Sequence, residues 1–233
     1  MYTLEISNFW YYTIMIVVIL HVLIAFGYLM YKLSSPKKKK MKMSKVFLLK
    51  ELEVMGPATR DNRQRVSNLV IDNPDLIQPL IKIVFDVNHK LSYRAAWILE
   101  FVLTQKNKLD WIAPHLTDFT TNISKVYHDS AVRPCAKICE YIAKAYSSNK
   151  YSIIKDVLTD DHIIKIIETG FDWMISQQKV AVKAYTMETL YLLGSDYKWV
   201  YEELKLVIQQ NMASGSAAYK ARGKKILALI DEK

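Results

Sequence analysis

A run of 23 residues, from 9 to 31, contains no Asp, Glu, Lys or Arg. A helix of about 20 apolar residues spans the hydrocarbon core of a bilayer, so this run strongly constrains the fold of the N-terminal part. Aromatic side chains, which favour the membrane–water interface, stand at both ends of the run. They are Phe9, Trp10, Tyr11, Tyr12, Tyr28 and Tyr31. The sequence therefore predicts one transmembrane helix within a membrane anchor formed by residues 1–32.

A lysine-rich segment follows the apolar run. Its basic residues are Lys37, Lys38, Lys39, Lys40 and Lys42. Because cytoplasmic flanks carry the excess of Lys and Arg, we expect the N-terminus outside and the C-terminal domain in the cytoplasm. Each lysine near an anionic leaflet also contributes about 1 kcal/mol of attraction. The lysines of this basic linker, residues 33–43, therefore either attract lipid, which is an expected partner, or serve only as a topology signal.

Other interpretations of the N-terminal part stay open. The first alternative is a buried core helix of a soluble domain. Such a helix is usually apolar along one stripe, whereas this run is apolar on all sides. A chain translated from Met43 would lack the anchor and lie in the cytoplasm. His21, near the middle of the run, either faces a partner helix through a hydrogen bond or is simply tolerated there.

The remainder of the chain has the composition of a folded helical protein. Hydrophobic residues make up 51% of the sequence and charged residues 24%, which excludes a disordered polymer. Only 6 Gly and 6 Pro occur, and strand-type alternation is scarce, so an all-α fold is expected. The net charge is +9. From residue 43 onward we count 26 Lys and Arg against 22 Asp and Glu, so this part is only mildly basic.

Apolar residues recur at helical spacing through this part, and every second predicted helix begins with a similar pattern. The predicted helices cover residues 73–85, 92–104, 117–127, 130–147, 160–175, 179–193, 197–212 and 216–230. A basic residue near the start of alternate helices defines the pattern, at Arg94, Arg133, Lys183 and Lys220. Its spacings are 39, 50 and 37 residues. Periods near 40 with two helices per unit are typical of α-solenoids.

Asp129-Ser130-Ala131-Val132-Arg133 is the clearest single copy of this pattern. It resembles the Asp-x-x-Val-Arg opening of the second helix in HEAT repeats. The resemblance implies a HEAT-like α-solenoid of about four helical pairs within residues 44–233. Such repeats stack on one another and leave an extended concave face, which usually binds a partner.

A wider resemblance covers residues 43–233. Segments 91–101, 129–141 and 183–194 resemble a small family of helical bacterial proteins whose members are often labelled adenylosuccinate lyase. This implies a bacterial, intracellular protein, so that the predicted anchor would lie in the inner membrane. Lyases of that superfamily carry a Gly-Ser-x-x-Met-Pro loop, but neither Gly194-Ser195 nor Gly215-Ser216 is followed by Met-Pro. We therefore transfer no catalytic residue.

The sequence has no phosphate-binding glycine loop, His-Glu-x-x-His, Cys-x-x-Cys or Gly-x-Ser-x-Gly motif. Cys135 and Cys139 are one helical turn apart, with His128 near the helix start. The two cysteines either bind a metal or act as a redox pair or, as we expect, are small residues of the core. No cofactor and no metal is predicted.

Aromatic and basic residues raise nucleic acid as an alternative partner. Trp111, Trp173 and Trp199 lie in or near first helices of their units, where indoles hold unpaired bases or pack in the core. A HEAT-like DNA glycosylase of the alkylation-repair type has this architecture. The last helix carries Lys220, Arg222, Lys224 and Lys225, which form either the polar cap of the solenoid or a site for an acidic partner or a phosphate.

Glutamates follow the basic residues of three units. Glu100, Glu140 and Glu188 either pair with cations across helices or line a partner-binding face. The leading hypothesis is a membrane-anchored, non-catalytic scaffold that binds a protein partner. The alternatives are the nucleic-acid binder or glycosylase and, third, the lyase that the family label suggests.

Overall fold

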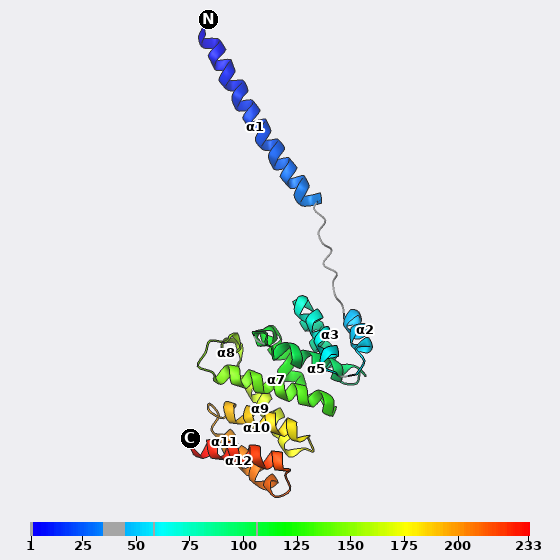
Figure 1. Cartoon of the computed structure of the whole chain (residues 1–233). Coiled ribbons are helices and arrows are strands. Elements are labelled where there is room, and N and C mark those ends of the chain that lie inside the picture. Colours follow the sequence, from blue (N-terminus) through cyan, green and yellow to red (C-terminus); the bar gives the residue numbers. More distant parts are fainter. Residues whose placement is uncertain (1, 35–44, 58, 106) are drawn as a thin grey trace. The chain divides into compact units, whose positions relative to one another are not determined.

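The structure is a computed structural model that describes residues 2–34, 45–57, 59–105 and 107–233. The chain divides into two compact units, Met1–Lys42 and Met43–Lys233 (Figure 1). Lys37, Lys38, Lys39, Lys40 and Lys42, which we expect to flank the membrane, lie outside the described residues.

The first unit contains one helix, α1 (Tyr2–Ser34). Its segment Trp10–Gly27 has a mean hydropathy of 2.0, and none of it is buried. Length and composition suit a membrane span, and a signal sequence near an N-terminus has the same properties. The Nδ1 atom of His21 lies 2.8 Å from the carbonyl oxygen of Val17 one turn earlier, so the ring is hydrogen-bonded within its own helix.

Some of the expected anchor residues are described only as backbone. Phe9, Tyr28 and Tyr31 lie within α1, and their side chains are outside the described set. Trp10, Tyr11 and Tyr12 are exposed or nearly so on α1. The helix ends at Ser34, so it includes the first two residues of the segment predicted as a linker.

In the second unit the helices pack as two rows. The A row consists of α2 (Lys45–Val54), α4 (Ile77–Val84), α6 (Leu116–Asn122), α9 (Asp160–Ile175) and α11 (Trp199–Met212). The B row consists of α3 (Arg60–Asp72), α5 (Ser92–Leu103), α7 (Asp129–Ser147), α10 (Val180–Leu193) and α12 (Ala217–Asp231). Each B helix packs on the next one along the row, and α4, α9 and α11 pack on the B helices that follow them in the chain.

The predicted repeat corresponds to the later part of these rows. The four predicted opening patterns begin α5, α7, α10 and α12, all in the B row. The pair α2 and α3 precedes them and extends the solenoid beyond the predicted four pairs. A short helix, α8 (Ile153–Val157), lies between α7 and α9 and accounts for the long spacing of 50 residues.

Short 3-10 segments lie at some of the junctions between helices. The 3-10 segments are η1 (Pro74–Leu76), η2 (Leu109–His115) and η3 (Ile123–Lys125), and η2 contacts both α4 and α6. Asn73 directly precedes η1 but makes no side-chain cap bond there. Its amide instead donates a 3.0 Å hydrogen bond to the carbonyl of Leu69 at the end of α3. A capping box does start α9, where Thr159 and His162 satisfy each other's backbone N–H groups.

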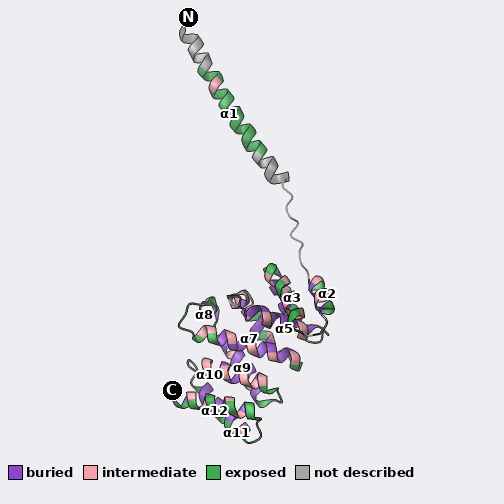
Figure 2. Cartoon of the chain, viewed as in Figure 1, coloured by how far each residue is buried: buried purple, intermediate pink, exposed green. Residues whose placement is uncertain are grey.

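The core runs through both rows, and Figure 2 shows buried residues along the helices of the second unit, including α5 and α7. Fully buried examples are Leu80 on α4, Ile98 on α5, Ile138 on α7 and Leu190 on α10. Because each unit buries its apolar side only against its neighbours, stability depends on stacking the whole array.

Candidate partner-binding face

The side of α7 that faces away from the core carries a basic stripe. Arg133, Lys137, Tyr141 and Lys144 recur at intervals of three or four residues, which places them on one side of the helix. Both Lys137 and Lys144 lie near the Tyr141 ring, with each ammonium nitrogen about 6 Å from the ring centroid (6.0 Å and 5.9 Å). These four residues are partly or fully exposed, whereas the opposite side of α7 is buried.

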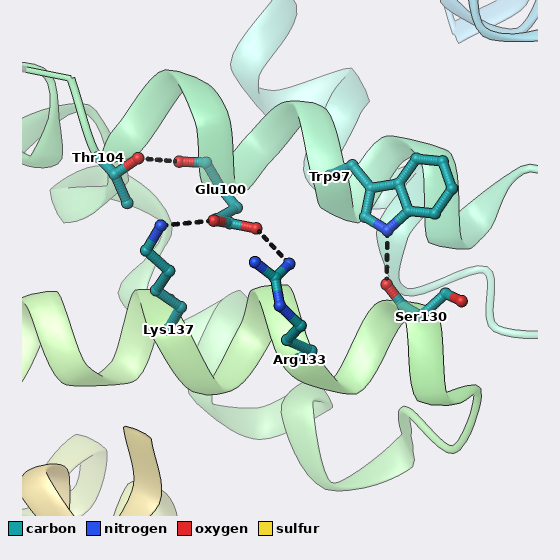
Figure 3. A network of polar contacts seen from close by, with 6 residues as sticks. All are labelled: Trp97, Glu100, Thr104, Ser130, Arg133 and Lys137. Atoms are coloured by element: carbon teal, nitrogen blue, oxygen red, sulfur yellow. Dashed lines mark hydrogen bonds and ion pairs between the residues drawn. The ribbon is translucent and has the colours of Figure 1, made fainter. Parts of the chain in front are cut away.

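Glu100 on α5 joins two of these cations. Its carboxylate accepts a 2.7 Å hydrogen bond from Lys137 and lies 3.4 Å from Arg133 (Figure 3). Burial lowers the pKa of Lys137, but the hydrogen bond and charge of Glu100 outweigh burial, so the pKa is raised. Beside them, the Trp97 indole donates a 2.8 Å hydrogen bond to the carbonyl of Ser130. This network connects α5 to the first half of α7.

The other two predicted glutamates are also paired. Glu140 accepts a 2.8 Å hydrogen bond from Lys144 within α7. Glu188 on α10 accepts one of 2.8 Å from Arg222 on α12. Pairing across helices therefore occurs for Glu100 and Glu188.

In each of these ion pairs the carboxylate is more buried than the cation. The side chains of Glu100 and Glu140 are 7% exposed and that of Glu188 is 15% exposed. Their partners Arg133, Lys137, Lys144 and Arg222 are 39%, 24%, 49% and 33% exposed. The glutamates lie largely beneath the surface, so the cations are the more exposed groups of these pairs. A face lined by the carboxylates themselves is not what the structure shows.

The repeat-defining residues have different partners in different units. Arg94 donates hydrogen bonds of 2.8 and 3.1 Å to the carbonyls of Leu52 and Glu53 at the end of α2. Asp129 lies 3.5 Å from Lys179, which precedes α10. These two contacts bridge neighbouring units.

The two lysines of the same pattern are only partly exposed. Lys183 on α10 and Lys220 on α12 occupy positions corresponding to Arg94 and Arg133 in the repeat. Burial lowers the pKa of Lys183. The four basic residues therefore occupy equivalent positions in the repeat but differ in their contacts.

Charge is unequally divided between the rows. Within their bounds the B helices carry 12 Lys and Arg against 7 Asp and Glu, a net of +5. The A helices carry 5 Lys and Arg against 9 Asp and Glu, a net of −4. The modest net charge of the whole unit therefore conceals a basic row and an acidic row.

The three tryptophans considered for base stacking lie off the B row. Trp173 on α9 is 5% exposed and belongs to the core. Trp199 on α11 is 49% exposed and stacks on Phe171 with ring centroids 6.0 Å apart. Trp111 in η2 lies beneath the ammonium of Lys108 at 4.1 Å. The tryptophans that suggested base stacking therefore do not share a row with the basic residues of α12.

Cys135 and Cys139 are both buried in the core. Burial raises the pKa of Cys135 to about 12 and also raises that of Cys139. The Nδ1 atom of His128 accepts a hydrogen bond from the backbone N–H of Ser130. Among the described residues no group of three His, Cys, Asp or Glu side chains is placed to hold a metal ion.

A depression of about 540 Å³ lies at the C-terminal ends of α7 and α10, and Tyr146 and Asp196 are among its lining residues. The Tyr146 hydroxyl donates a 2.6 Å hydrogen bond to Asp196, which raises the pKa of Tyr146 to about 12. The residues of this pair are 50 positions apart in sequence, so no local pattern indicated it.

Comparisons with known proteins agree with the observed architecture. The family model described as a HEAT repeat domain matches residues 50–230. Neither the curated proteins nor the solved structures gave a match. The matched residues cover the two helical rows from α2 to α12. The chain belongs to the HEAT repeat family.

Proposed function

We propose that this HEAT repeat protein is a membrane-anchored, non-catalytic scaffold that binds a protein partner on its B row. HEAT repeats commonly mediate contacts between proteins, and stacked repeats present long surfaces suited to that role. The observation that carries the proposal is the stripe of Arg133, Lys137, Tyr141 and Lys144 along the outer side of α7. Aromatic and Arg side chains are the types enriched at protein interfaces.

The membrane part of the proposal is supported by α1. Its apolar segment, Trp10–Gly27, is long enough for a bilayer and contributes nothing to a core within the described residues. The lysines that follow favour the cytoplasmic side, so the N-terminus would lie outside and the repeat unit in the cytoplasm. In a bacterium this is the inner membrane.

The anchor is tested by separating membrane and soluble fractions and determining the N-terminus of the native protein by mass spectrometry. We expect a membrane-bound chain that begins near Met1 and resists extraction by alkaline carbonate. A soluble chain that begins at Met43 would contradict the anchor. It would leave the docking function to be tested separately.

The docking function is tested by photo-cross-linking in cells. A photoreactive phenylalanine derivative replaces Tyr141 on the B row or, as a matched control, Leu206 on α11 of the A row, which is 49% exposed. We expect a discrete protein adduct from position 141 and none of the same mass from position 206. Identical adducts from both positions, or none from position 141, would contradict docking on the B row.

A further inference from the structure

Ion pairs in which the carboxylate is buried and the cation is more exposed recur along the B row. Glu100, Glu140 and Glu188 hold their basic partners in place while remaining almost wholly beneath them. Lys225 lies one turn after Arg222 on α12 and is exposed. We call Arg133, Lys137, Lys144, Arg222 and Lys225 the basic face. Its cations are positioned in advance by the protein's own carboxylates, so less side-chain entropy is lost when an outside anion binds them.

We infer that the basic face binds an acidic segment of the partner protein, whose carboxylates contact the exposed sides of the cations on α7 and α12. This inference rests on the proposed function and specifies the chemistry of the partner. An acidic segment complements the charge of this surface, because five cations stand over three carboxylates and the B helices as a row carry a net of +5, against −4 on the A helices of the same unit.

The separation of the two basic helices sets the length of the segment. Helix α10 lies between α7 and α12 and packs on both. Packed helices are about 8–10 Å apart, so the cations of α7 and α12 are separated by roughly 20 Å across the row. An extended chain covers that distance with about six residues. A short acidic stretch is therefore enough to bridge both groups of cations.

The charge pattern favours a protein over a nucleic acid. The five cations of the basic face stand above three carboxylates, so the face has a small net charge rather than a continuous basic groove. Nucleic-acid affinity depends on neutralising many phosphates, whereas protein carboxylates can meet a few separate cations. Trp173 and Trp199, which suggested base stacking, lie on the other row.

The experiment measures binding of a fluorescent peptide to the full chain in a nonionic detergent. The probe is a peptide of about twelve residues in which Glu alternates with Ser, long enough to span the face. The comparison probes are the same peptide with Gln in place of Glu and an oligothymidylate of equal length. The test variant is Lys144→Gln with Lys225→Gln on the B row. The control variant is Lys50→Gln with Lys82→Gln, which removes two exposed charges from the A row.

We expect the Glu peptide to bind, the Gln peptide to bind much more weakly, and added salt to weaken the Glu peptide. The B-row variant should reduce its affinity about fivefold to tenfold, as the loss of two exposed charge pairs implies, and the A-row variant should leave it unchanged. Unaltered melting temperatures exclude unfolding as the cause.

Other results overturn the inference. They are absence of Glu-peptide binding, equal binding of the Gln peptide, equal losses in both double variants, and tighter, B-row-dependent binding of the oligothymidylate. The last result would assign the face to nucleic acid. The proposed scaffold function fails differently, through the absence of a cross-linked protein at position 141. A cross-linked partner without an acidic segment would overturn the inference alone.

Discussion

The carboxylate of Glu100 on α5 lies 2.7 Å from the ammonium nitrogen of Lys137 on α7, beneath a surface that only the cation reaches. The same carboxylate contacts Arg133 one turn earlier on α7. Glu100 thus holds two successive units in register and positions two of the cations of the basic face. One side chain therefore connects the stability of the stack with the proposed docking face.

Replacing this carboxylate should weaken the stack. We expect Glu100→Gln to lower the free energy of unfolding by about 2 kcal/mol, because two cations lose a buried, charged hydrogen-bond acceptor. Urea titration followed by circular dichroism measures the change. Glu203→Gln on α11, where the side chain is exposed, serves as the control and should have little effect. Equal losses in the two variants would show that Glu100 does not connect the helices energetically.

The Tyr146–Asp196 hydrogen bond should make stability depend on alkaline pH. The folded chain raises the pKa of Tyr146 to about 12, compared with about 10 for an unperturbed tyrosine. The stabilisation is therefore complete below about pH 10 and is lost as the pH rises through about 12. We expect Tyr146→Phe to lower the free energy of unfolding by about 1 kcal/mol at neutral pH, and by less above pH 10.

Urea unfolding of Tyr146→Phe and the parent protein across this pH range measures the effect. The control is Asp196→Asn, which removes the charge that favours the protonated phenol. In that background the Tyr146→Phe difference should depend less on pH, because burial, Tyr197 and Asp160 still raise the pKa of Tyr146. A difference that stays constant through pH 12 in the parent background would contradict the assignment.

The two cysteines should not react with thiol reagents in the folded protein. Cys135 and Cys139 are buried, and burial raises the pKa of both thiols. Because the thiolate is the reactive form, we expect neither to react with Ellman's reagent at mildly alkaline pH until a denaturant is added. Ala228→Cys on the exposed side of α12 provides a thiol that should react at once. Rapid native reaction of two thiols in the parent chain would show that the core around α7 opens readily.

Gly223 sets the distance between the last two helices. A Cβ atom at this position would lie 2.9 Å from Ile208 Cγ2 and 3.2 Å from Met212 Sδ on α11. We expect Gly223→Leu to lower the free energy of unfolding by about 2 kcal/mol or more, because α12 must move away from α11. Ala221→Leu, on an exposed position of the same helix, should have a small effect in the same thermal or urea titration. Similar melting curves for both variants would contradict close packing at Gly223.

Much of the helical architecture could be predicted because it depends on neighbours in the sequence. Apolar residues at helical spacing indicated α7 and α9 through α12, and the short opening Asp129–Arg133 indicated the HEAT repeat that the family match confirms. The pair α2 and α3 was missed. Neither begins with the repeat pattern, and α3 is largely polar in sequence, so their packing on α4 and α5 had to be seen in three dimensions.

The candidate site could be predicted only in part. Sequence singled out Glu100, Glu140 and Glu188 and the basic residues near them, but it left open which groups would be exposed. Tyr146 and Asp196 gave no signal at all, since they meet across 50 residues.

The sequence by itself determined the apolar N-terminal helix, the helical class and the repeat, because each follows from spacing within one or two turns. Tertiary structure decided the rest. Stacking set the register of α5 against α7 and of α10 against α12, and this register placed Glu100 under Lys137 and Glu188 under Arg222. The burial of each carboxylate beneath its cation depends on the neighbouring helix, so only the packed rows define a basic face.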